Sequence, residues 1–566
     1  MSKEKTEGSR TRAAVGGIAG ITLAFGITEL VHGLYAMVPS VLVSIAQGIV
    51  EYTPGTLVTQ GIELLGTADI PVLIATVIMG TLAIAAGLAI LAVKRPALAL
   101  AGVAVLAGIA IVATFAEPFI APAATVVTIV GALLAGTAVA ELVLRAAGLR
   151  TVEPAEGGAA AQTGEPGGAF SPVTRSREAG PEGAISVGRG GFLLLGGGAV
   201  VAGLVAAGVG RFLTGGAAQQ ASAPEKLDLP EAPAKKEGAA EQEGSGAKDA
   251  ATHDTLPSPP EDASIDVAGM PKLITPAADF YLIDAALSSP RIDVNSWKLS
   301  VKGAVDNPVA FSYKDLLGMS TREADITLSC VSNKVGGGLI SNGRWTGVLL
   351  SDVLAEAGVS RDNITSASRQ LVGRSVDGWT SGFKTELALD GREALVAFGL
   401  NDSELPVNHG YPVRLVVPGI YGYVSATKWI TEIELTNWNF DAYWIQRSWS
   451  KEGPIKTQSR IDTITDGDNL PAGKTPIGGV AWAPHIGIEK VEVSTDGGET
   501  WNEARLASQL GIDTWRQYVY DWDAEPGDHT IQVRATDGEG ETQTAQEAPP
   551  HPSGATGYHS IDVSVA

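Results

Sequence analysis

Five apolar stretches in the first 213 residues limit the possible folds of this chain more than any other feature. They lie at residues 13–37, 70–93, 96–116, 120–144 and 190–213, and each is nearly free of charged side chains. About twenty consecutive apolar residues are enough for a helix to cross the hydrocarbon core of a bilayer. A soluble bundle of buried helices, the alternative, does not need so many long uncharged runs. The sequence therefore predicts an α-helical transmembrane bundle, acting as a membrane anchor, over residues 1–213.

Lysine and arginine residues flank these stretches in a consistent pattern. Basic side chains precede the first stretch, follow the second and the fourth, and precede the fifth; they are Lys3, Lys5, Arg10, Arg12, Lys94, Arg95, Arg145, Arg150, Arg175 and Arg177. Because cytoplasmic loops carry an excess of Lys and Arg, we expect the N-terminus to lie in the cytoplasm. Five crossings then leave the chain after residue 213 outside the cytoplasm, in a multi-pass protein of the cell membrane.

Two ionisable residues, Glu29 and His32, lie one helical turn apart within the first stretch. Such residues are either functional or a satisfied polar pair between helices, and we favour the polar pair. His32 is the only one of the seven histidines in this half of the chain. Because this half cannot supply two histidine ligands to a haem, we expect no haem in this chain.

The composition changes sharply after the fifth stretch. Residues 214–265 are rich in Pro, Glu and Ala, which predicts a disordered tether. All eleven tryptophans lie at or after Trp297, as expected for a water-soluble half that follows a lipid-facing one.

The charge of the whole chain excludes one class of function. Its 62 acidic residues outnumber its 40 basic residues, which gives a formal charge of −22. The sequence therefore argues against nucleic-acid binding, because few side chains would neutralise phosphates. We interpret the acidic excess as the hydrated surface of a salt-adapted protein.

Cys330 is the only cysteine among the 566 residues. It follows the strand-like run 326–329 and precedes three glycines at 336–338, where the backbone is least hindered. A single thiol cannot form an internal disulfide. Cys330 is therefore either a small buried hydrophobic residue or, as a thiolate, a ligand for a soft metal.

The residues around Cys330 resemble the metal-binding segment of the sulfite oxidase family. They read Thr-Leu-Ser-Cys-Val-Ser-Asn at 327–333 and Arg-Trp-Thr-Gly-Val at 344–348. Further stretches extend the likeness over residues 270–566; they are 280–284, 297–308, 313–317, 378–383 and 409–429. The resemblance implies an α+β molybdopterin domain over residues 266–470. In it, the Cys330 sulfur would bind molybdenum, with tungsten as the alternative metal.

The stretch 409–429 contains a histidine, two cations and several glycines that could converge on an anion. Molybdopterin carries a phosphate and a polar pterin edge, which need charge-assisted donors and close backbone approach. The resemblance implies that side chains of this stretch and of two earlier motifs contact the cofactor. They are Tyr281, Ser381, His409, Arg414, Ser425, Thr427 and Lys428.

The chain departs from the family at positions that affect the substrate. Sulfite oxidases have an arginine and a histidine where this chain reads Leu282–Ala285, and a tyrosine beside the metal where it has Trp449. Arg344 and Arg447 are matched cations, and Lys334 stands near where the family has arginines. We expect these four side chains to form the catalytic site with Cys330. Since an oxyanion needs positive charge beside the metal, sulfite, a sulfoxide or another small oxo-compound are the candidate substrates.

Residues 471–566 alternate short strand patterns with Asp-Gly turns, at Asp496-Gly497 and Asp537-Gly538. This pattern is typical of an antiparallel sandwich. It resembles the immunoglobulin-like dimerisation domain of the same family, so we expect an all-β sandwich and a homodimer.

These observations predict a multidomain oxidoreductase that transfers an oxygen atom to or from a small substrate. Because the chain has no haem domain of the animal type, electrons would pass to a separate carrier: a cytochrome, a copper protein or a quinone-linked subunit. The competing interpretation is a non-enzymatic surface protein that binds a partner through its sandwich domain.

Overall fold

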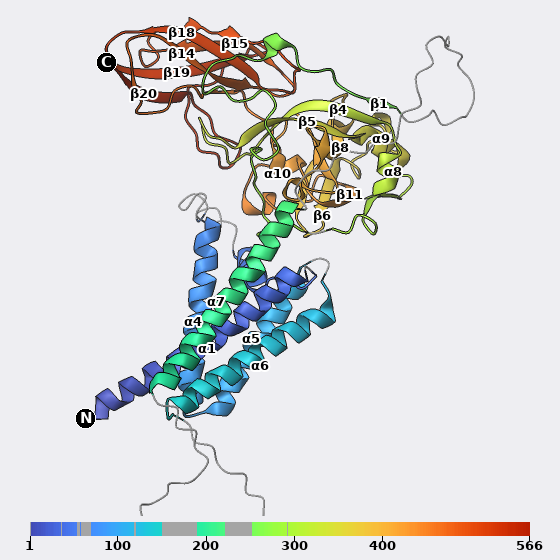
Figure 1. The fold of residues 1–566 in the computed structure, drawn as a ribbon. Coiled ribbons are helices and arrows are strands. Elements are labelled where there is room, and N and C mark those ends of the chain that lie inside the picture. Colours follow the sequence, from blue (N-terminus) through green and yellow to red (C-terminus); the bar gives the residue numbers. More distant parts are fainter. Residues whose placement is uncertain are drawn as a thin grey trace, which may run out of the picture. The chain divides into compact units, whose positions relative to one another are not determined.

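The computed structural model describes residues 2–35, 37–53, 57, 61, 69–117, 120–149, 189–220, 252–290 and 292–566. The chain divides into two compact units (Figure 1): Met1–Tyr52 with Leu65–Ala217, and Thr53–Leu64 with Ala218–Ala566. The first unit is helical and the second is rich in β-strands. Most of the predicted tether lies outside the described residues, as do Arg150, Arg175 and Arg177.

The helical unit confirms the prediction of five long apolar helices. The helices that the structure describes there are α1 (Ser2–Leu34), α2 (Val41–Tyr52), α4 (Asp69–Ala92), α5 (Pro96–Phe115), α6 (Pro122–Ala146) and α7 (Arg189–Gln220). All but α2 contain a segment long and apolar enough to cross a membrane; these are Gly8–Leu34, Ile70–Ala92, Pro96–Phe115, Pro122–Ala146 and Leu194–Leu213. Helices α5 and α6 begin with proline, which fits the first helical position because the amide hydrogen it lacks would be unpaired there.

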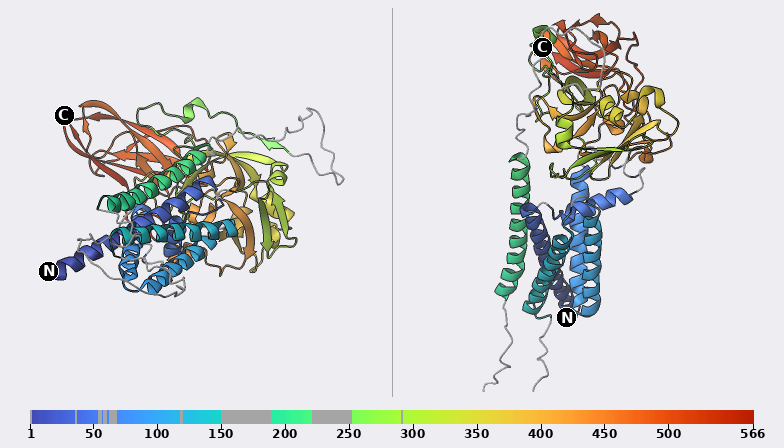
Figure 2. Two further views of the ribbon diagram at one scale, coloured as in Figure 1. Left: turned by 60° about the horizontal axis from the view of Figure 1, so that its bottom comes forward. Right: turned by 90° about the vertical axis from the view of Figure 1, so that its right-hand side faces the viewer.

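Helix α1 lies against three neighbouring helices (Figure 2), and the closest contacts are made by small residues. At each contact, a Cβ atom on the α1 glycine would collide with the backbone of the neighbour. The close pairs are Gly26–Gly203 on α7, Gly20–Gly136 on α6 and Gly17–Ala85 on α4. Small residues allow this approach of backbones, which is how helices associate in an apolar solvent.

The two ionisable residues of the first stretch have partners within the unit. Glu29 is buried, accepts a hydrogen bond from Ser40 at 2.5 Å and lies 3.8 Å from the Arg211 guanidinium on α7. The His32 Nδ1 lies 2.8 Å from the carbonyl oxygen of Val38. Glu29 thus has a polar partner on another helix, as the favoured interpretation expects, whereas His32 contacts the backbone just after its own helix.

The second unit begins with two sheets that carry the predicted molybdopterin domain. One has the strand order β1-β4-β5-β8-β10, with β9 paired to β8, and the other has the order β3-β2-β11-β6-β7. The strands are β1 (His253–Asp254), β2 (Lys298–Gly303), β3 (Val309–Ser312), β4 (Thr321–Ser329), β5 (Ile340–Leu349), β6 (Gln370–Ser375), β7 (Thr380–Lys384), β8 (Leu395–Leu400), β9 (Ser403–Glu404), β10 (Arg414–Val416) and β11 (Ile430–Thr436).

Short helices and a continuous apolar core join these two sheets. The helices are α8 (Tyr313–Leu317), α9 (Leu350–Glu356) and α10 (Gly422–Ser425). A capping box at Ser312 starts α8, because its hydroxyl accepts from the Asp315 amide while the Asp315 carboxylate accepts in return. Buried side chains from both sheets, such as Leu299, Leu371 and Phe398, belong to one apolar cluster.

The C-terminal part of this unit is built from two further sheets around a shared core. Their orders are β12-β14-β18-β17 and β13-β20-β19-β15-β16. The strands are β12 (Gln458–Ile461), β13 (Asn469–Leu470), β14 (Gly473–Trp482), β15 (Ile488–Ser494), β16 (Asn502–Glu503), β17 (Arg505–Leu506), β18 (Arg516–Ala524), β19 (Gly527–Asp537) and β20 (His559–Val565). Strand β12 precedes the predicted boundary at residue 471 and pairs with β14. Its likeness to an immunoglobulin-like domain stays a prediction.

The C-terminal sheets contact the segment that follows Cys330. Arg460 donates from Nη1 to the carbonyl oxygen of Gly337 at 2.8 Å. A Cβ at Gly336, whose φ is +72°, would collide with the ring of His559. The thiol-bearing turn is therefore held by both halves of the second unit.

Candidate active site

Cys330 lies at the end of β4, in the turn that leads into β5. Its amide donates to the carbonyl oxygen of Leu339 at 3.0 Å, and its own carbonyl oxygen accepts from the Asn333 amide at 3.0 Å. The Asn333 side chain closes the turn by accepting from the Leu339 amide at 2.9 Å. These bonds fix the backbone on both sides of the thiol.

The Cys330 thiol faces a cavity of about 120 Å³ within the second unit. Burial raises the pKa of the thiol, while hydrogen bonds from the backbone and hydroxyl of Ser332 oppose that rise. The cavity walls include Phe280, Tyr281, Asp284, Ser375, Asp377, Trp379, His409, Arg414, Tyr423, Lys428, Trp429, Trp444 and Trp449. The walls combine charged, aromatic and hydroxyl groups with one thiol. A thiol in such a place is deprotonated when it coordinates a metal ion.

Two cations predicted to bind the cofactor, Arg414 and Lys428, line this cavity. The Arg414 guanidinium lies 5.0 Å from the ring centroid of Trp345 and donates to the carbonyl oxygen of His409 at 3.1 Å. The Lys428 ammonium donates to a backbone carbonyl at 2.9 Å and pairs with Asp284 at 2.5 Å. Burial lowers the pKa of Arg414 to about 10 and that of Lys428 to about 8. Both side chains are therefore mainly cationic at neutral pH.

His409 also lines the cavity and is neutral. Its Nε2 lies 3.2 Å from the carbonyl oxygen of Ala277, and its ring meets Phe280 edge to face. Burial, followed by the charges of Lys428 and Arg414, lowers the pKa of His409 to about 3. A neutral imidazole beside two cations can donate or accept a hydrogen bond without adding charge.

Several buried polar atoms around the cavity lack a hydrogen-bond partner among the described residues. They are the indole nitrogens of Trp379 and Trp449 and the hydroxyl of Ser375. Buried donors of this kind are costly unless a ligand satisfies them. Together with Arg414, Lys428 and the Cys330 thiol, they offer a metal ligand, two cations and spare donors. This donor set fits a metal-bearing pterin with an anionic group.

Three other predicted cofactor residues lie behind the cavity wall. The hydroxyls of Ser381 and Thr427 are 2.6 Å apart, and both residues are fully buried. Ser425 donates to the carbonyl oxygen of Tyr421 at 3.0 Å. Thr427 directly precedes Lys428, and its carbonyl oxygen accepts from the Leu415 amide next to Arg414 at 2.9 Å. The three residues do not line the cavity themselves.

The predicted catalytic residues divide between the cavity and other places. Trp449 lines the cavity. Arg447 lies just beside it, with its guanidinium 3.6 Å from the ring centroid of Tyr443 and its Nε buried without a partner among the described residues. Lys334 is exposed in the turn that follows Cys330. The structure therefore brings Trp449, with Arg447 next to it, to the thiol's cavity and leaves Lys334 at the surface.

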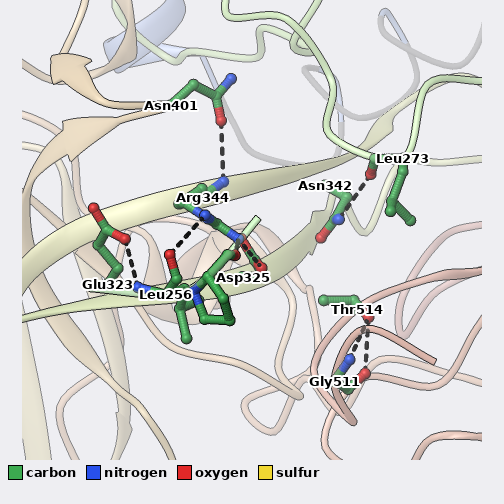
Figure 3. Close-up of polar contacts among 10 residues, drawn as sticks. Leu256, Leu273, Glu323, Asp325, Asn342, Arg344, Asn401, Gly511 and Thr514 are labelled. Atoms are coloured by element: carbon green, nitrogen blue, oxygen red, sulfur yellow. Dashed lines mark hydrogen bonds and ion pairs between the residues drawn. The ribbon is translucent and has the colours of Figure 1, made fainter. Parts of the chain in front are cut away.

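Arg344 lies outside the cavity and holds a different part of the chain (Figure 3). Its Nε and Nη2 donate to the Asp325 carboxylate, both at 2.9 Å. Nη1 and Nη2 also donate to the carbonyl oxygens of Leu256 and Pro257, at 3.3 and 3.1 Å. Successive residues of a strand point to opposite faces. Because Trp345 packs against Arg414, its neighbour Arg344 points away from the cavity.

Two acidic residues of the cavity were not predicted from the sequence. Asp284 pairs with Lys428, and burial raises the pKa of the Asp284 carboxyl although Lys428 opposes that rise. Asp377 accepts a hydrogen bond from the Trp379 amide at 3.1 Å. The only signal for Asp284 was its place in a segment that departs from the family pattern. No sequence pattern indicated its pairing with a lysine far along the chain.

Residues 286–444 match the family model described as the oxidoreductase molybdopterin binding domain. These residues carry most of the cavity, including Cys330, His409, Arg414 and Lys428. The chain therefore contains a molybdopterin-binding domain and is an oxidoreductase. The non-enzymatic interpretation is not supported.

Sulfite oxidases and nitrate reductases are among the relatives of this chain. Mitochondrial sulfite oxidase of Rattus norvegicus is 30% identical over 274 residues, which cover 42% of this chain and 50% of that protein. The Homo sapiens enzyme is 30% identical over 271 residues, or 41% and 49% of the two chains. An NADH nitrate reductase of Spinacia oleracea is 26% identical over 271 residues, or 39% and 29%. The chain thus spans about half the length of the sulfite oxidases that it matches.

One solved structure with similarity is the sulfane dehydrogenase SoxCD from Paracoccus pantotrophus. Its sequence is 23% identical, the TM-score is 0.46, and the match covers 52% of this chain and 84% of that chain.

Proposed function

We propose that this protein is a membrane-anchored oxidoreductase outside the cytoplasm that transfers an oxygen atom to or from a small substrate, in the manner of a sulfite oxidase. The observation that carries the proposal is the cavity in which the Cys330 thiol, Arg414, Lys428 and the neutral His409 converge. The five helices long and apolar enough to span a membrane support the anchor. The distribution of Lys and Arg supports the orientation.

Each residue of the cavity has a defined task in this proposal. When bound, the molybdenum cofactor would supply the two-electron oxygen-atom transfer. Cys330 would ligate the metal as a thiolate, held in place by the hydrogen bonds of its turn. Arg414 and Lys428 would bind anionic or polar groups of the cofactor, and the buried donor of Trp379 would complete the polar contacts. The aromatic side chains, Trp449 among them, would exclude water from the reacting atoms.

The charges of the cavity favour a second candidate, a reductase of sulfoxides or other neutral oxo-compounds at the same site. Asp284 neutralises Lys428, Asp377 adds another carboxylate, and Arg344 lies elsewhere. An oxyanion such as sulfite needs preorganised positive charge where it binds. Among the residues that the structure describes, Arg447 beside the cavity stays available as an additional cation. A neutral substrate needs no such charge.

The electron partner and the assembly follow from the same proposal. Electrons would pass between the cavity and a separate carrier, such as a cytochrome, a copper protein or a quinone-linked subunit. The C-terminal sheets would serve dimer formation. Anchoring raises the local concentration of identical chains, which favours such a dimer.

Metal analysis and a substrate panel test the proposal. The full chain, produced in a molybdate-replete host, should contain about one molybdenum per chain, because one thiolate ligand serves one metal centre. It should turn over sulfite or a sulfoxide with an artificial electron dye. Cys330→Ala should abolish turnover and metal retention, while Lys334→Ala, a change at the surface, serves as the matched control. Full activity of Cys330→Ala, or a wild-type chain without metal or pterin, would refute the proposed site.

Membrane attachment and orientation are tested separately. The chain should stay in the membrane fraction after an alkaline carbonate wash. Protease added to intact cells should remove the catalytic unit, since the proposed orientation exposes it. Protection of that unit in intact cells, with cleavage only after lysis, would contradict the orientation without affecting the catalytic assignment.

A further inference from the structure

The helical unit contains a second cavity, larger than the catalytic one and mostly apolar. It has a volume of about 440 Å³ and lies among helices α1, α4, α5 and α6. Small residues such as Gly20, Ala89 and Ala99 face it, so side chains do not fill the space between the helices. Among the described residues on its walls, the polar side chains are Thr137, Glu141 and Arg145.

Water is a poor occupant of this cavity. A water molecule takes about 30 Å³ and needs two to four polar partners, so the cavity would need many more polar groups than it has. The Thr137 hydroxyl already donates to the carbonyl oxygen of Leu133 at 2.7 Å. Glu141 and Arg145 pair with each other at 2.9 Å. The walls therefore suit a hydrocarbon chain.

The polar groups gather at one end of the cavity, and that end is basic. Arg145 stands in the last turn of α6. Lys94 and Arg95 form the turn between α4 and α5, next to the wall residues Ala92 and Pro96. Arg12 belongs to the same end, because its guanidinium donates to the carbonyl oxygen just after α6, at 3.4 Å. Four cations thus lie at this end, and Glu141 is the acid among the described side chains that line the cavity.

The length of the cavity matches one leaflet of a bilayer. Its wall on α6 runs from Arg145 to Leu133, which is about 18 Å at 1.5 Å per residue. This length is similar to the thickness of one leaflet, which is half of a hydrocarbon core of about 30 Å. At the end opposite Arg145, the wall residues Ala24 and Leu106 are apolar. The cavity therefore has the polarity and length of a single amphiphile with an anionic head.

We propose that this cavity binds one anionic phospholipid, with its phosphate at Arg145 and one of its two acyl chains along α6. Basic pockets between membrane helices bind anionic head groups in this way. A neutral quinone would leave the four cations without a complementary charge. The inference rests on the membrane location in the proposed function, and it assigns the helical unit a lipid-binding site besides its role as an anchor.

The site can be tested with the full chain in nanodiscs of equal parts phosphatidylglycerol and phosphatidylcholine. Native mass spectrometry should find one phosphatidylglycerol retained per chain, in preference to phosphatidylcholine. Val103→Trp, which fills the cavity from α5, should abolish most of the phosphatidylglycerol retention. Val105→Trp on the same helix is the matched control, because Val105 is exposed and does not line the cavity. Arg145→Gln should weaken retention about fivefold, since one basic side chain near a membrane contributes about 1 kcal/mol.

Three outcomes would overturn this inference. They are equal retention of the two lipids, equal phosphatidylglycerol in the two tryptophan variants, and recovery of a neutral lipid or a second chain at the site. Wild-type selectivity alone decides the question if a variant fails to fold. A chain that stays in carbonate-washed membranes but does not select phosphatidylglycerol refutes only the lipid site. A chain released by that wash refutes the membrane anchor instead.

Discussion

Replacing Arg344 by methionine should destabilise the second unit without removing a catalytic group. Arg344 and Asp325 are paired across β4 and β5, with side chains only 11% and 6% exposed. The substitution leaves the Asp325 carboxylate buried and unpaired, which costs about 3–5 kcal/mol. It also removes the donors to the carbonyl oxygens of Leu256 and Pro257. For a domain of this size, we expect a Tm lower by roughly 10 °C.

Thermal unfolding followed by tryptophan fluorescence measures this effect selectively. All eleven tryptophans lie at or after Trp297, so the signal reports the second unit alone. The control is the double variant Arg344→Met with Asp325→Leu, which removes both charges. It should recover most of the loss, because an apolar pair of similar volume replaces a buried ion pair with little cost.

The competing expectation is that Arg344 acts on the substrate, as the sequence resemblance implied. In that case Arg344→Met would lower kcat/KM by more than about tenfold while the Tm stayed unchanged. The double variant would then be as inactive as the single one. Such a result would refute the structural role derived from the Asp325, Leu256 and Pro257 contacts.

Three further predictions concern other parts of the chain. Because the pKa of buried His409 is about 3 in the folded state and ordinarily 6.5, only the unfolded state gains a proton between these values. The free energy of unfolding should therefore fall by roughly 2 kcal/mol from pH 7 to pH 5. Urea unfolding at several pH values should show that this free energy depends less on pH in His409→Gln, and an unchanged pH dependence would contradict this. Gly336→Ala should lower the Tm more than Gly378→Ala, because both glycines have positive φ but only the first would drive a Cβ into His559; equal Tm values would argue against this contact. The charge of −22 predicts a Tm that rises with salt, since salt screens repulsion among acidic side chains, and a falling Tm would contradict the salt-adapted surface.

The sequence predicted the helical unit well because its signals are local. A hydrocarbon solvent demands long uncharged runs; Pro96 and Pro122 mark where two of them begin, and the basic residues flank their cytoplasmic ends. The structure places the five apolar helices within a few residues of the predicted stretches. The apolar cavity among α1, α4, α5 and α6 could not be predicted, because its size depends on how closely small residues let the helices approach one another.

The catalytic cavity was predicted in part. A motif identifies residue types, so Cys330, His409, Arg414 and Lys428 could be chosen, and the structure brings these four to one cavity. A motif does not say which way a side chain points. Arg344 matched the family and yet faces the other side of its strand.

Pairings between distant segments were also beyond the reach of sequence reasoning. Asp284 precedes β2 and Lys428 lies between α10 and β11, so these two residues meet only in the tertiary fold. Ser381, Ser425 and Thr427 were predicted as cofactor contacts, yet they support the cavity wall from behind. These placements depend on the tertiary fold.

Residues at both ends of the second unit pair with its sheets, which has a practical consequence for producing a soluble fragment. Strand β1 pairs with β4, the strand that leads into Cys330, and Leu256 just after β1 forms hydrogen bonds with Glu323 and Arg344. At the other end, the amide of the last residue, Ala566, donates to the carbonyl oxygen of Leu470 at 2.9 Å. An expression fragment that starts after residue 257 would lose the pairing of β1 with β4. A fragment shortened at its C-terminus would lose backbone hydrogen bonds of the C-terminal sheets. The shortest fragment worth making therefore runs from residue 252 to residue 566.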